Sequence, residues 1–316
     1  MRLLVLGATG FIGEATLRAA RAAGHEAFGL ARRRSDRSDL LRGDRNAPEA
    51  VAALVDRHRI DAVVDVVAWT EATTRPLLTA LDGRVDRYVL LGSADVYANY
   101  ELLMRTVTGT PTPVLREDAP LRTTRHPYRT DPRRPADDPD AWRDDYDKIP
   151  IEEAVRALQS PWTILRLPMV FGAGDRQHRF RWAIRPMLEG RETLTIPPAW
   201  ARWVTTFGYV EDVGAAIVHA ATHPAAARRV LNVGERTPVA QLAWARRFAT
   251  LLDWSGSIES GDASPLAATA EALDLAVPLH LDTAALYDGL GFAAPTALDD
   301  ALRATVAAER GREPAR

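Results

Sequence analysis

The stretch that decides the fold is LLVLGATGFIGEATLRAARAAGHEAFGLARRR, residues 3–34. It begins with the short apolar run LLVLG, which is typical of a buried parallel strand. Apolar residues then recur at helical spacing at Ile12, Ala15 and Ala19, and Gly24 stands where a helix should end. A second strand-like run, HEAFGLA, follows at once. The stretch therefore predicts a strand, a glycine-rich turn, a helix and a second strand.

The turn carries glycine at every third position, in the pattern G-x-x-G-x-x-G. Glycine permits a tight turn and lets backbone amides approach an anion, and a helix N-terminus offers free N–H groups and a positive dipole end to a pyrophosphate. The spacing differs by one residue from the G-x-G-x-x-G fingerprint. Placed between this strand and this helix, it predicts a dinucleotide site; a glycine-rich turn without a ligand is the alternative. The expected contacts are Gly7, Thr9, Gly10, Phe11, Ile12 and Gly13.

The residues after the second strand should distinguish the two nicotinamide dinucleotides. A carboxylate there would bind the ribose 2′-hydroxyl of NAD, whereas arginine accommodates the 2′-phosphate of NADP. Arg32, Arg33 and Arg34 occupy this place. A solvated basic loop is the alternative, and Asp36 could still serve NAD. The pattern favours NADP(H) over NAD(H), with Arg32 and Arg33 as contacts.

Strand-like and helical segments alternate along the chain. The apolar runs are at 3–6, 26–31, 60–68, 87–91 and 163–167, and helical segments include 47–58 and 150–159. This alternation predicts an α/β fold with a doubly wound parallel sheet of Rossmann type. Ligand should then bind beyond the carboxyl ends of the strands.

Composition narrows the function classes. The 316-residue chain has no cysteine, which excludes disulfides, thiolate zinc sites and cysteine nucleophiles. No cluster of His, Asp and Glu has metal-ligand spacing, so no metal is expected. No apolar run suits a signal peptide or approaches ~18 residues, so we expect a cytoplasmic protein without a membrane segment. The net charge of −2 disfavours nucleic acid as a partner.

Several motifs, in the right order, resemble the extended short-chain dehydrogenase/reductase family of the NAD(P)-dependent epimerase and dehydratase type. They are GATGFIG (7–13), LRGDRN (41–46), IDAVVDVVAW (60–69), RYVLLGSADVYAN (87–99), ILRLPMVFGAGD (164–175) and FGYVEDVGAAIVHA (207–220). The resemblance extends from residue 1 to about 305. It implies reduction, epimerisation or dehydration of a small polar metabolite, and a homodimer by likeness to relatives.

The resemblance also implies a domain division and further site residues. The dinucleotide domain would comprise 1–170 and about 204–234, and a smaller α+β C-terminal substrate domain would comprise 171–203 and 235–316. Further cofactor contacts would be Asp44 at the adenine, Ala68 beside the cofactor, and Pro168 and Val170 at the nicotinamide. Ser93 would be the catalytic serine, which hydrogen-bonds the substrate oxygen.

The catalytic tyrosine is displaced. In this family a tyrosine precedes a lysine by four residues, so both share one helix face and the lysine lowers the pKa of the tyrosine. Lys148 fits the lysine, which implies that it holds the nicotinamide ribose, but Asp144 stands four residues before it and Tyr146 only two. Pro150 belongs in a first helical turn, so the helix should begin near Ile149 and leave Tyr146 in a loop.

Three interpretations stay open. Tyr146 can be a displaced acid/base; another group, from Asp144, Tyr97 or the substrate, can move the proton; or hydride chemistry is lost and the fold binds or senses a cofactor. The candidate catalytic residues are Ser93, Tyr146, Lys148 and Asp144. A likeness to RNA-binding chloroplast relatives of the family is opposed by the net charge of −2.

Two segments concern the substrate side. Residues 105–145 are rich in Pro, Arg and Asp, and we expect a loop folding over the active site; a disordered surface insertion is the alternative. The segment 175–203 brings arginine and tryptophan, which suit a phosphorylated, carboxylated or nucleotide-linked substrate. Expected substrate contacts are Trp69, Tyr97, Gln177, His178, Arg179 and Trp203, whereas Phe180, Ile184 and Leu188 read as core. The tail 309–316 should be disordered.

Overall fold

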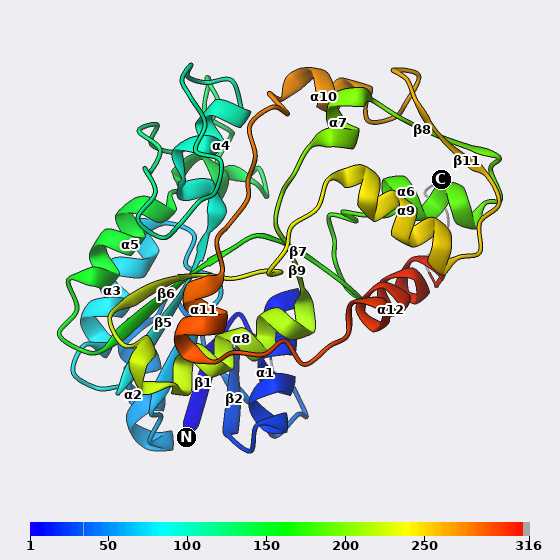
Figure 1. The fold of residues 1–316 in the computed structure, drawn as a ribbon. Helices are drawn as coiled ribbons and strands as arrows, with labels where there is room; N and C mark the ends of the chain where they lie inside the picture. Colours follow the sequence, from blue (N-terminus) through cyan, green and yellow to red (C-terminus); the bar gives the residue numbers. More distant parts are fainter. Residues whose placement is uncertain (34, 312–316) are drawn as a thin grey trace.

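Seven parallel strands form the main sheet of the structure, a computed structural model that describes residues 1–33 and 35–311. The strands are β1 (Arg2–Leu6), β2 (Glu26–Ala31), β3 (Leu40–Arg42), β4 (Ala62–Asp65), β5 (Arg87–Ser93), β6 (Trp162–Leu167) and β10 (Arg229–Asn232). Their order is β10-β6-β5-β4-β1-β2-β3, so the chain winds outward from β1 in both directions (Figure 1). This confirms the doubly wound sheet.

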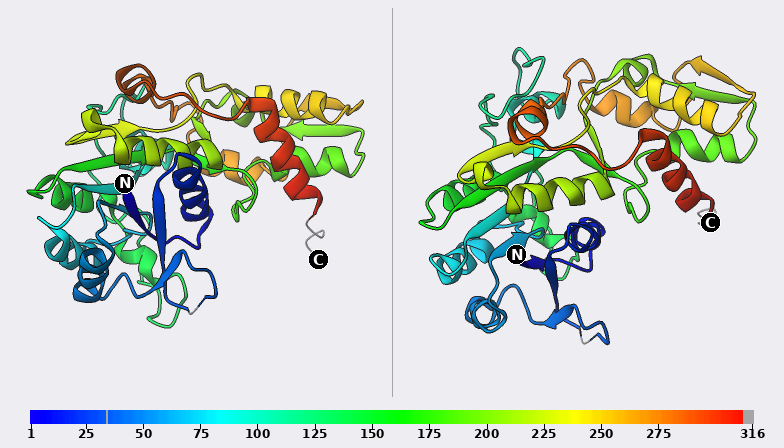
Figure 2. Two further views of the ribbon diagram at one scale, coloured as in Figure 1. Left: turned by 90° about the horizontal axis from the view of Figure 1, so that it is seen from below. Right: turned by 60° about the horizontal axis from the view of Figure 1, so that its bottom comes forward.

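Helices cover both faces of the sheet (Figure 2). One face carries α1 (Phe11–Ala22), α8 (Val210–Thr222) and α11 (Ala284–Leu290), and the other carries α2 (Pro48–His58), α3 (Glu71–Leu81) and α5 (Lys148–Arg156). Side chains of β1 alternate between the layers, with Leu3 and Val5 in one core and Leu4 and Leu6 in the other. Both faces are thus buried, which explains the uninterrupted apolar run. The predicted glycine stop of α1 is confirmed, because Gly24 has a φ of +78°.

A smaller lobe lies beside the carboxyl edge of the sheet (Figure 1). It contains β7 (Met169–Phe171), α6 (Arg181–Leu188), β8 (Thr193–Ile196), α7 (Pro198–Arg202), β9 (Phe207–Tyr209), α9 (Gln241–Leu251), β11 (Ser257–Ser260), α10 (Ala267–Ala272) and α12 (Leu298–Arg310). Two parallel strand pairs, β8–β11 and β7–β9, join these helices around an aromatic core that includes Phe180 and Ile184. The expected α+β lobe is confirmed, and so are these two residues as core.

Two details differ from the sequence predictions, and a third concerns residues that the structure does not describe. The apolar run 60–68 forms a strand only at β4, because the Asp65 carboxylate accepts the N–H of Val67 at 3.2 Å and turns the chain. The expectation of a disordered tail is wrong for Glu309, which is buried in α12. Arg34 and residues 312–316 lie outside the described residues.

The described chain contains no helix with the length and apolarity that crossing a bilayer requires.

Candidate active site

The glycine-rich turn joins β1 to α1 at the carboxyl edge of the sheet. Gly7 has a φ of +83°, and a Cβ on Gly13 would lie 2.2 Å from the carbonyl oxygen of Gly7. Neither position accepts a side chain without rearranging the turn. Gly10 precedes the helix without a capping side chain, so N–H groups of the first turn, which includes Phe11 and Ile12, remain available. The turn fits a pyrophosphate held by backbone amides.

The ends of β2 and β3 lie along the same edge of the sheet as this turn. Arg32 and Arg33 follow β2 directly and are exposed. Asp44 follows β3, and its Oδ1 accepts the N–H of Asn46 at 2.9 Å. Asp44 is therefore a turn residue in the structure, whereas the two arginines present positive charge to solvent.

Ser93 and Tyr146 approach one another at the end of β5. The Ser93 Oγ accepts the N–H of Asp95 at 3.2 Å, in the short 3-10 turn Ala94–Val96. Tyr146 has extended backbone between the 3-10 turn Ala141–Asp145 and α5, so helical spacing does not govern its direction. Its hydroxyl donates a hydrogen bond of 2.9 Å to Oδ2 of Asp95.

Lys148 completes this cluster from the first residue of α5, one residue before the predicted start. Its Nζ donates to the carbonyl oxygens of Ala68, at 2.6 Å, and Leu91, at 2.9 Å. It also lies 5.7 Å from the ring centroid of Tyr146. An ammonium has three donors, so one N–H of Lys148 is left after these two bonds.

Lys148 is also the only lysine among the 40 basic residues of the chain. A lysine can lose its charge when buried, which an arginine does not do. Burial lowers the pKa of Lys148 from 10.5 to about 8, although Asp95 and Asp65 act in the opposite direction. The one residue of its type thus stands at the position where its distinct chemistry would be used.

The electrostatics of Tyr146 differ from those of a tyrosine beside a lysine alone. Burial and the carboxylate of Asp95 raise the pKa of Tyr146 well above its ordinary value, and the hydroxyl of Ser93 only partly opposes them. Burial also raises the pKa of Asp95, against hydrogen bonding by Tyr146 and the charge of Arg122. In this arrangement the phenol keeps its proton.

Two of the alternative proton-transfer groups are directed elsewhere. The Asp144 carboxylate accepts the N–H groups of Thr130, at 3.2 Å, and Arg134, at 2.7 Å, and pairs with the Arg134 guanidinium. Tyr97 is fully buried and donates to Oδ1 of Asn232 at 2.6 Å. Both groups, proposed from the sequence as alternative proton-transfer residues and Tyr97 also as a substrate contact, therefore already have partners within the protein.

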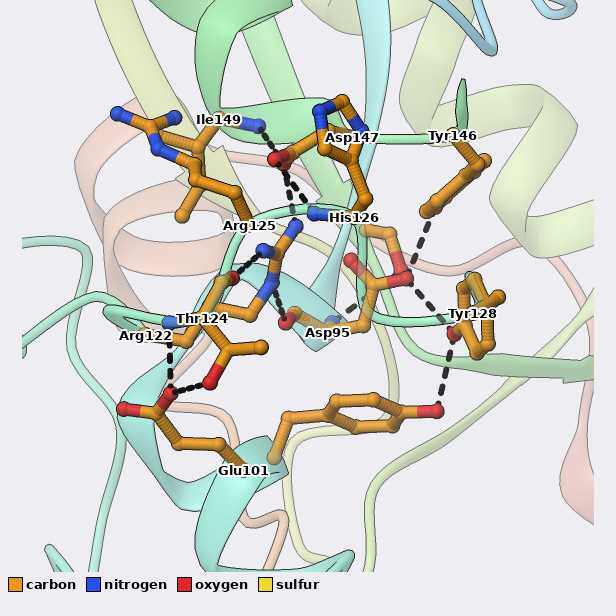
Figure 3. Close-up of polar contacts among 12 residues, drawn as sticks. Asp95, Glu101, Arg122, Thr124, Arg125, His126, Tyr128, Tyr146, Asp147 and Ile149 are labelled. Carbon is orange, nitrogen blue, oxygen red and sulfur yellow. Dashed lines mark hydrogen bonds and ion pairs between the residues drawn. The ribbon is translucent and has the colours of Figure 1, made fainter. Parts of the chain in front are cut away.

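The inserted segment 105–145 packs against this cluster (Figure 3). Arg122 is buried and donates to the carbonyl oxygen of Asp95 at 2.9 Å and to Oδ1 of Asp147 at 2.5 Å. Tyr128 donates to Oδ2 of Asp95 at 3.0 Å. The segment therefore lies over the candidate site, as the loop interpretation predicts, and does not form a detached surface insertion.

Two tryptophans stand at the rim of the site. Trp69 follows β4 and remains 40% exposed, and its ring stacks on Trp142 of the inserted segment with centroids 4.3 Å apart. The backbone carbonyl of Trp69 accepts the N–H of Asp147 at 3.3 Å. This hydrogen bond places the tryptophan pair next to the segment that contains Tyr146 and Lys148.

In the segment 175–203, two of the expected substrate contacts make hydrogen bonds within the protein. Trp203 is buried, and its Nε1 donates to the carbonyl oxygen of Val277 at 3.0 Å. Arg179 pairs with Asp175 at 2.8 Å and bonds the carbonyl oxygen of Val170. Internal contacts thus engage both side chains, and their role as substrate contacts stays a prediction.

The neighbouring polar residues are differently placed. Gln177 is exposed, whereas Nδ1 of His178 lies 3.0 Å from Oε1 of Glu309 in α12. Pro168 lies between β6 and β7, and Val170 is buried in β7. Among the described residues no group of three or more His, Cys, Asp and Glu could hold a metal ion.

The sequence did not single out four residues that shape the site, which are Asp95, Arg122, Tyr128 and Trp142. A signal existed for Asp95, because an acidic residue two positions after the end of a buried strand lies at the ligand edge of a parallel sheet. Arg122 and Tyr128 lie in irregular chain and Trp142 in a single 3-10 turn, where no periodicity indicates which side chains point inward.

A separate cavity of about 340 Å³ lies between α8, α9 and the chain that leads into α12. Its lining includes Phe207, Tyr209, Glu235, Trp244 and Tyr287. Ser93, Tyr146 and Lys148 do not line it. This cavity is distinct from the cluster described above.

Solved structures with the same fold include several sugar-nucleotide enzymes. MoeE5, solved in complex with UDP-glucose and NAD, shares 22% sequence identity with a TM-score of 0.67, over 98% of this chain and 99% of that chain. A putative epimerase from Burkholderia cenocepacia J2315 shares 21% identity with a TM-score of 0.72, over 98% of each chain. UDP-glucuronic acid 4-epimerase from Bacillus cereus, solved with UDP-glucuronic acid and NAD, shares 18% identity with a TM-score of 0.66, over 98% and 99%.

At these identities the likeness establishes the fold. A search of curated proteins found no match. The family model described as "NAD dependent epimerase/dehydratase family" matches residues 3–234, which is most of the chain and includes the glycine-rich turn, Ser93, Tyr146 and Lys148. The chain belongs to the NAD dependent epimerase/dehydratase family.

Proposed function

We propose that this protein is an NAD(P)-dependent enzyme that reduces, epimerises or dehydrates a small polar metabolite with an altered tyrosine–lysine motif. The observation that carries the proposal is the convergence of Ser93, Tyr146 and Lys148 at the end of β5, although Tyr146 stands two residues from the lysine. A displaced tyrosine whose side chain still reaches the serine end of β5 supports catalysis better than loss of function.

The chain's own groups suit a nicotinamide dinucleotide at this edge. The first turn of α1 would hold the pyrophosphate, and the remaining N–H of Lys148 would hold the nicotinamide ribose. Exposed Arg32 and Arg33 would meet a 2′-phosphate, so we infer a preference for NADP(H), although MoeE5 was solved with NAD. When bound, the dinucleotide supplies hydride acceptance and return.

On the substrate side, the Ser93 hydroxyl would hydrogen-bond the reacting oxygen and Tyr146 would exchange its proton. The stacked pair Trp69–Trp142 offers an aromatic surface at the rim. A phosphorylated, carboxylated or nucleotide-linked metabolite remains our proposed substrate class, and the sugar nucleotides of the structural neighbours support it.

A cofactor-binding scaffold without turnover is the second candidate. One observation favours it: burial and Asp95 hold the proton on Tyr146, which is the opposite of the activation that a neighbouring lysine provides. The two candidates share the dinucleotide site and differ in whether a bound substrate changes the cofactor's absorbance.

The experiment uses the purified chain and two glycine variants. Nucleotide released on denaturation is identified by mass spectrometry, and NADPH and NADH are then titrated by calorimetry. Gly13→Ala should weaken both by at least about tenfold, because its methyl would meet the carbonyl of Gly7 at 2.2 Å. Gly289→Ala in α11 is the matched control, since a Cβ there would lie 3.7 Å or more from its nearest neighbours. Equal binding by wild type and Gly13→Ala, or binding by neither, would refute the proposal.

A further inference from the structure

One carboxyl oxygen of Asp95 accepts hydrogen bonds from two tyrosine hydroxyls. Its Oδ2 accepts Tyr146 at 2.9 Å and Tyr128 at 3.0 Å, and the Tyr128 oxygen in turn accepts the hydroxyl of Tyr100 at 2.9 Å (Figure 3). The other carboxyl oxygen, Oδ1, is buried with no hydrogen-bond partner among the described residues. The carboxyl group is thus fixed with one oxygen facing a chain of tyrosines that come from three separate segments.

Two cations near Asp95 favour its ionised form, whereas burial favours its protonated form. The guanidinium of Arg122 is held against the Asp95 backbone carbonyl, at 2.9 Å, but its ion pair is with Asp147. Lys148 contributes a second positive charge. Neither cation bonds the carboxyl oxygens directly, and two neutral phenols do. Burial accordingly outweighs these partners and raises the pKa of Asp95.

Tyr146 cannot be the base in its phenolate form while Asp95 is a carboxylate. Two adjacent negative charges in a buried site repel one another, which is the reason that Asp95 raises the pKa of Tyr146. A neutral phenol between a substrate hydroxyl and a carboxylate can, however, accept one proton while it releases another. The 2.9 Å hydrogen bond from Tyr146 to Asp95 already has the direction that this exchange needs.

We propose that Asp95 is the terminal proton acceptor of a Tyr146–Asp95 relay, which replaces the lysine-activated tyrosinate of the family pattern. The inference rests on the proposed function and specifies the acid/base part of it. Asp95 acts through Tyr146 and is a positioning residue that also stores the proton.

In the oxidation of a substrate carbinol, two protons would move along the relay. The substrate O–H bond breaks and its proton bonds to the Tyr146 oxygen, while the phenol proton passes to Oδ2 of Asp95. An oxidised nicotinamide dinucleotide, when bound, would take the carbinol hydrogen with both electrons of the C–H bond, so that C–O becomes C=O. Tyr146 is neutral before and after, and Asp95 changes from carboxylate to carboxylic acid. Reduction reverses each transfer.

Tyr128 is the built-in comparison for Tyr146. It donates to the same oxygen at nearly the same distance, but it comes from the inserted segment and its own oxygen is occupied by Tyr100. Its loss should change how readily Asp95 holds a proton without removing the path from substrate to Asp95. A structural cluster without proton transfer would make no such distinction between the two tyrosines.

The decisive test needs no substrate. The chain has seven tyrosines, and ζ-¹³C-tyrosine NMR would follow each ionisation, with Tyr146 assigned by its absence in Tyr146→Phe. In wild type we expect the Tyr146 signal to stay protonated beyond the pH at which an ordinary tyrosine ionises, because burial and Asp95 raise its pKa. In Asp95→Asn it should titrate at least about one pH unit lower than in wild type, because the charge that holds the phenol neutral is gone. An unchanged Tyr146 titration in Asp95→Asn would overturn the relay.

The second measurement is the pH profile of turnover, with UDP-glucose and UDP-glucuronic acid as the first probes. Asp95→Asn and Tyr146→Phe should each lower the rate by about 10²–10⁴-fold, as for loss of a general base. Tyr128→Phe should retain the rate within about tenfold and move the acid limb upward, because Asp95 loses one donor to its ionised form. Equal loss in Tyr128→Phe and Tyr146→Phe would contradict the relay.

The calorimetric experiment and the tyrosine titration test the proposed function and the relay separately. Failure of the calorimetric experiment removes the proposed function, whereas the tyrosine titration reports on Asp95 whether or not cofactor binds. If Asp95→Asn does not fold, the Tyr128→Phe profile decides, since that variant leaves the relay pair intact.

Discussion

Arg122 and Asp147 form a buried ion pair, with 2.5 Å between Nη2 and Oδ1, that ties the inserted segment to the residue preceding Lys148. The same carboxylate caps α5, because its Oδ1 accepts the N–H of Ile149 at 3.1 Å. One contact therefore fixes both the loop over the site and the start of the helix that carries the lysine.

Removing this contact should be costly. Arg122→Ala leaves Asp147 buried without its partner, and we expect the free energy of unfolding to fall by about 3–5 kcal/mol. The control is Arg125→Ala, whose ion pair with Glu153 is solvent-exposed and should contribute about 0–1 kcal/mol. Urea denaturation of both variants measures the difference. Similar losses for the two arginines would show that the buried pair does not anchor the segment.

The tryptophan stack should couple the inserted segment to the end of β4. Trp69→Ala, Trp142→Ala and the double variant form a cycle in which we expect an interaction free energy of about 0.5–1.5 kcal/mol. A parallel cycle of Trp69 with the distant Trp254 should be additive. Additivity of the Trp69–Trp142 cycle would mean that the stack does not hold the segment in solution.

Lys148 predicts a specific pH dependence of stability. Its folded pKa, about 8, lies below the ordinary 10.5, so between these values the unfolded chain binds the extra proton and stability rises with pH. The free energy of unfolding of wild type minus that of Lys148→Met should therefore rise by roughly 3 kcal/mol at most from pH 8 to 10.5. Denaturant titrations at a series of pH values measure it. A difference that is flat or falls over this range would be contrary to a buried, proton-shedding lysine.

The arginines after β2 predict cofactor preference. Arg33→Asp should shift the ratio of NADPH to NADH affinity toward NADH by about 10–100-fold, because a carboxylate repels the 2′-phosphate and can accept the 2′-hydroxyl. Arg57→Ser, which removes an exposed charge on α2, should leave the ratio unchanged. If wild type binds NADH more tightly than NADPH, the assignment of Arg32 and Arg33 is wrong.

The sequence predicted the sheet, the glycine turn and the position of Lys148, because strand burial, turn geometry and helix spacing are local properties. It left Tyr146 undecided, since the direction of a side chain in extended chain depends on what packs around it. It missed Tyr128 and Trp142 for the same reason: the inserted segment has no period, and only tertiary contacts determine its inward residues. Asp95 could have been predicted from the sequence, because it stands two residues after Ser93 at the ligand edge of the sheet.

The most direct test of the central claim uses the single lysine. Protein labelled with ε-¹³C-lysine gives one lysine signal, that of Lys148, which reports its pKa and tests the proposed contact with a nicotinamide ribose. We predict that the free protein titrates near pH 8 and that saturating NADP⁺ shifts the signal in wild type but not in Gly13→Ala. A signal that titrates near 10.5 and does not respond to NADP⁺ or NAD⁺ would contradict the account.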